Sequence, residues 1–96
     1  MKATRAFLVC VVVGRVVYQD SAEELALLVK SDGLKPVGLL DAKRDKPDPA
    51  FFIGSGKVDE LGELAHELHA DVVVFDVPLS AAQQRNIERA IELPVL

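Results

Sequence analysis

The chain alternates short apolar runs with segments in which apolar residues recur at helical spacing. Residues 6–13 form an uninterrupted apolar run rich in β-branched side chains, the pattern of a strand covered on both faces in a parallel sheet. We expect residues 34–42 and 72–75 to be two further strands. Pro36 favours an early or edge position for segment 34–42, because proline cannot donate a hydrogen bond to a neighbouring strand.

Three segments between and after these strands have the periodicity of amphipathic helices. Ser21 and Glu24 have the spacing of a capping box, and Gly33 is a typical helix end. A second helix is expected over residues 57–69, and a third from the N-cap Ser80 to about residue 92. The residues that the three helices are expected to place on their buried sides are Ala22, Leu25, Leu28 and Val29 in the first, Val58, Leu61, Leu64, Ala65 and Leu68 in the second, and Gln83, Ile87, Ala90 and Ile91 in the third.

The order of these elements predicts the fold class. Alternating strands and helices indicate an α/β fold with a small open parallel sheet of three to four strands joined by helical crossovers. Residues 94–96 have the pattern of the start of a fourth strand. A chain of 96 residues can form one compact domain but has no room for two cores.

In such a sheet the loops after the strands emerge at one edge, toward which the helix N-termini also point. We expect an anionic partner, if there is one, to bind at this carboxyl edge. The residues expected there are Arg15, Lys43, Arg44, Lys46, Ser80 and the turn formed by Gly54, Ser55, Gly56 and Lys57.

Composition narrows the possible functions. Half of the residues are hydrophobic and 27% are charged, and the formal net charge is −4. This composition is ordinary for a soluble globular protein. The negative net charge argues against a protein that binds nucleic acid over its whole surface, although it permits a local basic patch. Lys43, Arg44 and Lys46 alternate with acidic residues, so composition alone favours a solvated loop over a binding patch.

The apolar run near the start of the chain has a second interpretation. Lys2 and Arg5 precede it as in a signal peptide, but the run is short, Arg15 follows closely, and no small-residue cleavage site is present. No segment has the roughly twenty apolar residues that span a bilayer. Cys10, the single cysteine, is expected to be buried and reduced within a strand. These features indicate a cytoplasmic protein without a membrane span.

Two patterns suggest chemistry, and in both a structural role is the better interpretation. Gly56 and Lys57 resemble the end of a phosphate-binding P-loop, but Phe51 occupies the position of its first glycine and Val58 that of the Mg²⁺-binding hydroxyl. A glycine-rich helix start is therefore favoured over nucleotide binding. His66 and His69 could share a metal with Glu63 or Glu67, but zinc normally takes three or four protein ligands, so exposed histidines are favoured.

Three longer stretches resemble the N-terminal domain of the HflX family of GTPases. They are residues 44–61 (RDKPDPAFFIGSGKVDEL), 70–76 (ADVVVFD) and 79–88 (LSAAQQRNIE). Ala81 stands where that family usually has proline, which leaves the Ser80 cap in place. The positions that carry the resemblance most clearly are Pro47, Asp48, Pro49, Gly54, Gly56, Lys57, Ser80, Gln83, Arg85 and Asn86.

The resemblance implies a function that the residues alone do not. The intact protein would bind GTP with Mg²⁺, hydrolyse GTP in a domain that follows residue 96, and associate with the large ribosomal subunit in ribosome splitting or rescue under stress. This domain would contribute to the ribosome contact, with Arg15, Lys43, Arg44, Lys46 and Lys57 as the expected residues, and would restrain its own GTPase domain. By itself it is expected to hold no cofactor or metal and to catalyse nothing.

Two other functions stay open on the sequence. One is a small nucleotide-binding or ligand-binding module that uses the turn at residues 54–57. The other is a structural domain that associates with itself.

Overall fold

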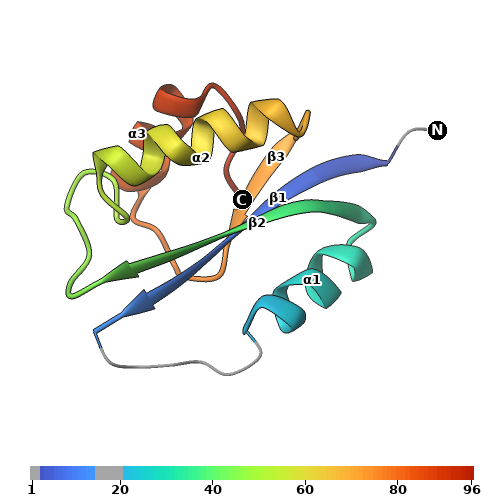
Figure 1. Cartoon of the computed structure of the whole chain (residues 1–96), viewed down its shortest axis with the longest axis horizontal. Coiled ribbons are helices and arrows are strands. Elements are labelled where there is room, and N and C mark those ends of the chain that lie inside the picture. Colours follow the sequence, from blue (N-terminus) through green and yellow to red (C-terminus); the bar gives the residue numbers. More distant parts are fainter. Residues whose placement is uncertain (1–2, 15–20) are drawn as a thin grey trace.

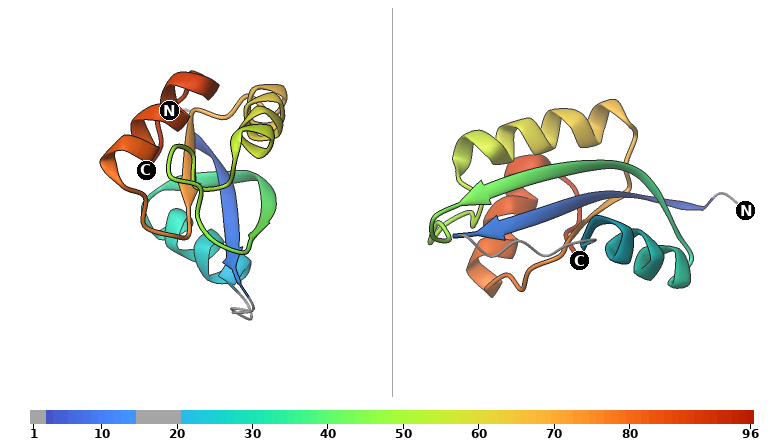
Figure 2. Two further views of the ribbon diagram at one scale, coloured as in Figure 1. Left: turned by 90° about the vertical axis from the view of Figure 1, so that its left-hand side faces the viewer. Right: turned by 60° about the horizontal axis from the view of Figure 1, so that its bottom comes forward.

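The computed structural model describes residues 3–14 and 21–96. The three strands form one parallel sheet in the order β2-β1-β3. Helix α1 lies on one face of this sheet, and helices α2 and α3 lie on the other (Figures 1 and 2). The α/β fold predicted from the alternation of patterns is therefore confirmed. In chain order the elements are β1 (Thr4–Val13), α1 (Ser21–Ser31), β2 (Leu34–Arg44), α2 (Ser55–Glu67), β3 (Val72–Phe75) and α3 (Ala81–Ile91).

Strand β1 is apolar from Ala6 to Val13 because both faces of the sheet are covered there. Phe7, Val9 and Val11 point toward α2 and α3, where they pack with buried residues of both helices. The alternate residues Leu8 and Cys10 point toward α1. Side chains of successive strand residues leave opposite faces, so each face receives half of the run. The predicted burial of Cys10 is confirmed.

The predicted buried stripe of α1 is partly wrong. Leu25 and Val29 are buried against the sheet, but Leu28 is 64% exposed. Among the described residues, α1 is the one helix on its face of the sheet (Figure 1). It therefore contacts the strands along a narrow stripe, and no other described helix covers Leu28. Leu27 is equally exposed. The side chains of Ser21, the expected N-cap, and Ala22 lie outside the part of the chain that the structure describes.

Strand β2 forms an edge of the sheet, as Pro36 predicted. Its register with β1 shifts by one residue between Ala6 and Phe7, which pair with Pro36 and Gly38. A bulge beside a proline is a common feature of edge strands, which must avoid pairing with other chains. The strand is two residues longer than expected and ends at Arg44. The prediction that the loop starts at residue 43 is therefore wrong, because Val12 and Val13 continue the pairing on β1.

The fourth strand predicted over residues 94–96 is present as a single parallel bridge between Val95 and Val73. Its hydrogen bonds run from Val73 N to Pro94 O and from Leu96 N to Val73 O, both at 2.9 Å. The N–H and C=O groups of Val95 face the opposite way and bind side chains of α3. Glu88 accepts from Val95 N at 2.9 Å, and Gln84 donates to Val95 O at 2.7 Å. Side chains of α3 therefore bind the N–H and C=O groups of Val95 that a further strand would otherwise pair with.

Helix α2 begins two residues earlier and ends two residues earlier than predicted. After Leu68 the chain turns at His69, which has a left-handed φ of 55°. His69 N donates to His66 O at 3.1 Å and Ala70 N donates to Ala65 O at 2.9 Å, the hydrogen bonds of a Schellman motif. This turn buries Ala70 and starts the connection to β3. Among the described residues, no helix has the length and apolar character of a membrane span.

Candidate functional site

The carboxyl edge of the sheet brings the ends of β1 and β2 next to the start of α2. Gly14 N donates to Arg44 O at 2.7 Å and so joins the two strand ends. The loop after β2 leads to Gly54, the N-cap of α2. We call Lys43, Arg44, Lys46 and Lys57 the basic edge. Arg15, which was expected to join them, lies outside the described residues.

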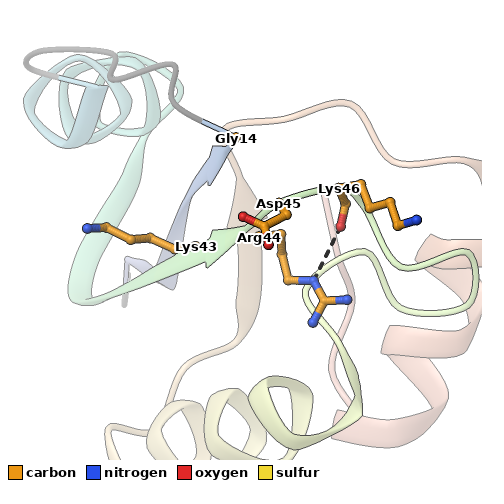
Figure 3. Close-up of a pocket in the computed structure, with 5 residues that line it drawn as sticks. All are labelled: Gly14, Lys43, Arg44, Asp45 and Lys46. Atoms are coloured by element: carbon orange, nitrogen blue, oxygen red, sulfur yellow. Dashed lines mark hydrogen bonds between the residues drawn. The ribbon is translucent and has the colours of Figure 1, made fainter.

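The basic residues of β2 diverge. Lys43 and Arg44 are successive strand residues, so their side chains leave opposite faces of the sheet. Ala42 packs among the residues facing α2, which places Arg44 on the α2 side and Lys43 on the α1 side. Figure 3 shows Lys43 pointing away from Arg44, whereas Arg44 lies against the backbone of Lys46. The two side chains, which the sequence groups in one loop, therefore point in different directions, although both residues line the hollows at the end of β2.

Arg44 covers the start of α2. Its Nε donates to Lys46 O at 3.4 Å, and a Cβ atom added to Gly54 would lie 2.9 Å from its Nη1. Gly54 has φ 88° and ψ 154°, a conformation that is essentially restricted to glycine. A side chain at residue 54 would strain the backbone and displace the guanidinium. The glycine at this position therefore has a structural reason that requires no bound phosphate.

The N-terminus of α2 has no negative side chain of its own, although Asp41 of β2 lines the hollow beside it. No side chain caps it, and its first turn contains no acidic residue. Free N–H groups at a helix start create a local positive potential, to which Arg44 and Lys57 add formal charge. Lys57 Nζ is paired with Glu60 at 3.1 Å, so part of its charge is neutralised. The start of α2 is therefore a place where an anion would be stabilised.

The turn differs from a P-loop at Phe51 and Val58, and both of these side chains contact the core. Val58 is 1% exposed and packs in the core, and Phe51 is half-buried against the same cluster. In a P-loop these positions provide a hydroxyl ligand for Mg²⁺ and a glycine beside the phosphates. A Cβ atom added to Gly56 would meet nothing within 4 Å, so space alone does not require glycine there.

Asp48 shapes the loop between the basic edge and α2. Its Oδ2 accepts from Ala50 N at 3.0 Å and from Phe51 N at 2.7 Å, the arrangement of an Asx turn. The backbones of Asp48 and Phe52 exchange two hydrogen bonds of 2.9 Å. Phe52 has φ 63° and is buried, so its packing offsets an unfavourable backbone conformation. The carboxylate of Asp48 is thus occupied inside the loop, between the exposed residues Pro47 and Pro49.

Helix α3 holds this loop from the other side. Ser80 is its N-cap, as predicted, and Gln83 completes a capping box with it. The amide of Gln83 also donates to Asp48 O at 2.9 Å, and Asn86 Nδ2 donates to Ala50 O at 3.0 Å. Arg85 is exposed. The polar side chains of Ser80, Gln83 and Asn86 therefore stabilise the start of α3 and the loop that contains Asp48.

The two histidines have separate positions. His66 Nε2 lies 2.6 Å from Ile91 O, which links α2 to α3. The carbonyl of His69 accepts from Arg5 Nε at 3.1 Å at the opposite end of the sheet. Within residues 3–14 and 21–96, no group of three or more potential ligands could hold a metal ion.

Asp76 is a polar residue of the carboxyl edge that the sequence analysis did not select. It follows β3, and its Oδ1 accepts from Val11 N at 2.9 Å, so it continues the pairing of β1 beyond the end of β3. Burial raises the pKa of its carboxyl above the ordinary value; the N–H groups of Val11 and Asp76 oppose this change, and the charge of Asp41 adds to it. Its position directly after an apolar strand was the available signal.

We expect Asp76→Asn to raise the melting temperature at about pH 7 and to leave it nearly unchanged at about pH 3. A raised folded-state pKa means that the group contributes stability in full below its unfolded-state pKa and loses that contribution as pH rises through the raised pKa. Asparagine stays neutral and can still accept from Val11. Thermal unfolding of both proteins at the two pH values tests this, and a lower melting temperature for the variant at both would contradict it.

The comparisons with known proteins agree with one another. The family described as GTP-binding GTPase N-terminal matches residues 19–96. The chain is 38% identical over 77 residues to the GTPase HflX of Escherichia coli (strain K12), which is 80% of this chain and 18% of that protein. It is 37% identical over 79 residues to the GTPase HflX of Alkalihalophilus pseudofirmus, 82% of this chain and 19% of that protein. The chain thus spans less than a fifth of the length of these two relatives.

Proposed function

The chain belongs to the GTP-binding GTPase N-terminal family, the N-terminal domain of HflX GTPases, and we propose that it contacts the large ribosomal subunit through its basic edge. Ribosomal RNA is the partner whose chemistry fits, because its backbone presents phosphates at regular spacing. The observation that carries the proposal is the meeting of Arg44, Lys46 and the uncapped start of α2 at one edge.

Electrostatics supports a local contact. The chain has a net charge of −4, so much of its surface is expected to repel RNA, and attraction depends on the few places where cations gather. Backbone N–H groups at a helix start and arginine side chains are both favourable ligands for phosphate. A contact of this size orients the domain on RNA and is too small to bind it tightly alone.

The members of the basic edge are proposed to contribute unequally. Arg44 lies beside the start of α2 and forms the centre of the basic edge, and Lys46, whose carbonyl Arg44 contacts, adds charge next to it. Lys57 contributes less because Glu60 partly neutralises it. Lys43 lines the hollow beside the start of α2 but its side chain points away from Arg44, so it is proposed to contribute less than Arg44. Arg15 stays part of the proposal on its position in the sequence.

The intact protein is proposed to act as a GTPase. In this proposal a GTP-hydrolysing domain follows this one, binds GTP with Mg²⁺ in its own P-loop, and is restrained by this domain until the ribosome is engaged. The protein would work in the cytoplasm, in ribosome splitting or rescue under stress. The supports are the family match, the name GTPase HflX of the relatives, and the small share of their length that this chain spans.

Co-sedimentation of this chain with large ribosomal subunits at two salt concentrations tests the proposal. We expect pelleting at low salt and a shallow decline as salt rises, with a slope of about two to three in log–log form, because only two or three phosphates are neutralised. Absence of pelleting at low salt would contradict a contact through this domain. Small subunits are the control, and equal binding to them would reduce the result to nonspecific attraction.

The alternative is a nucleotide-binding module that uses residues 54–57. Calorimetry of the chain with GTP and Mg²⁺ distinguishes it, and we expect no saturable heat because the side chain at residue 58 is an apolar group packed in the core. Micromolar binding that Lys57→Ala abolishes would favour the alternative.

A further inference from the structure

The loop between the basic edge and α2 is attached to α3 by two side chains of that helix. It spans residues 45–54 and has few apolar anchors, of which Phe52 and Ile53 are buried. Its other attachments are polar. Gln83 donates to Asp48 O, and Asn86 donates to Ala50 O. Both acceptors are backbone carbonyls, so these bonds hold the path of the chain and are independent of the loop's own side chains.

The two amides are set at helical spacing for this task. Gln83 and Asn86 are three residues apart on α3 and therefore lie on the same side of the helix. Ser80 and Gln83 form the capping box that fixes the first turn. Gln83 Oε1 accepts from Ser80 N while its Nε2 donates to the loop. One side chain thus joins the start of α3 to the loop.

The loop in turn determines where the cations of the basic edge lie. Its first residues include Lys46, whose carbonyl accepts from Arg44 Nε. Its last residue is Gly54, against which the Arg44 guanidinium rests. A shift of the loop would therefore move Lys46, Arg44 and the start of α2 relative to one another. Spacing matters for phosphate binding, because each contact must meet its own phosphate.

We infer that Gln83 and Asn86 are positioning residues for the ribosome contact: they bind the loop backbone and thereby hold Arg44, Lys46 and the start of α2 in one arrangement that matches RNA. Neither amide needs to touch RNA. The inference rests on the proposed function, and it assigns to these two residues a role beyond folding.

Two substitutions test the inference while preserving the helix. Gln83→Glu keeps the acceptor for Ser80 N, since glutamate is a normal member of a capping box, but it removes the donor to Asp48 O. Asn86→Leu has a similar size, removes the donor to Ala50 O and changes no charge. The matched control is Gln84→Glu, which makes the same chemical change one residue away and loses the bond to Val95 O instead.

Hydrogen exchange and co-sedimentation are measured on the parent chain and all three variants. We expect amides of residues 48–52 to exchange about three- to tenfold faster in Gln83→Glu and Asn86→Leu than in the parent, the effect of losing one hydrogen bond on a local opening. In the control these amides keep their parent rates. Binding to large ribosomal subunits at low salt should fall about two- to fivefold in the two test variants and stay near the parent value in the control.

Each outcome decides the matter. Parent exchange rates in both test variants would show that the amides do not hold the loop and would overturn the inference. Faster exchange with unchanged binding, or equal losses of binding in the control, would overturn the positioning role alone. A parent chain that does not bind the subunit would instead overturn the proposed function, and the positioning role would fall with it.

Discussion

Reversing the cations at the end of β2 is expected to weaken binding to the large ribosomal subunit by about tenfold or more at low salt. The variant carries Lys43→Glu, Arg44→Glu and Lys46→Glu. Each reversal removes a phosphate contact and adds repulsion. The slope of the logarithm of the binding constant against the logarithm of the salt concentration should therefore become shallower by up to about two to three units. Co-sedimentation at two salt concentrations measures both quantities.

A matched variant separates local contact from total charge. Lys30→Glu, Lys35→Glu and Arg89→Glu change the net charge by the same amount at exposed positions outside the basic edge. We expect this control to bind within about threefold of the parent, because distant exposed charges are screened beyond a Debye length. Equal losses in both triple variants would reduce the contact to general electrostatics. If the first variant pellets like the parent, the contact lies elsewhere.

Because the side chains of Lys43 and Arg44 point in different directions, their contributions to binding can be tested separately. Lys43→Glu alone should have a smaller effect than the double change Arg44→Glu with Lys46→Glu, since Arg44 lies beside the start of α2 and the double change reverses two charges. Circular dichroism and thermal unfolding are needed for every variant, because Arg44 also packs on Gly54. A dominant effect of Lys43 would move the contact to the α1 side of the sheet.

The sequence predicted the elements of this fold well because their patterns are strong and local. The apolar run of β1, the Ser80 cap and the stripe of Val58, Leu61 and Ala65 follow from periodicity and hydrogen-bonding chemistry, and all are found. Strand and helix ends were less certain. The end of β2 depends on pairing with β1, and the end of α2 depends on the Schellman turn at His69, which are contacts that a single segment does not encode.

The candidate site was predictable only in part. Its position at the carboxyl edge follows from topology, and most of its cations were identified. Their directions were not, because the assignment of Lys43 and Arg44 to a loop hid the alternation that separates them. The bonds from Gln83 and Asn86 to the loop were also out of reach, since they join residues about 35 positions apart. Only the folded chain brings those partners together.

The hydrogen bonds from Gln83 and Asn86 to the loop require that α3 is packed on the sheet. Truncating Ile87, a buried residue of this helix, should therefore have the largest effect on stability. Ile87 is fully buried between α3 and the sheet. Ile87→Ala is expected to cost about 2–5 kcal/mol of unfolding free energy, a large share of the roughly 5–15 kcal/mol typical of a domain. The melting temperature should fall by about 10 °C or more.

Leu27→Ala is the control for this core truncation, because it removes the same number of carbon atoms from a leucine that is 64% exposed on α1. Its expected cost is within about 0.5 kcal/mol. Urea titration of the parent and both variants gives the free energies. Ile87→Ala should also speed amide exchange in residues 48–52, since the loop is held by α3. A cost for Ile87→Ala no larger than that for Leu27→Ala would mean that α3 is not docked on the sheet, and the positioning of the basic edge by Gln83 and Asn86 would lose its basis.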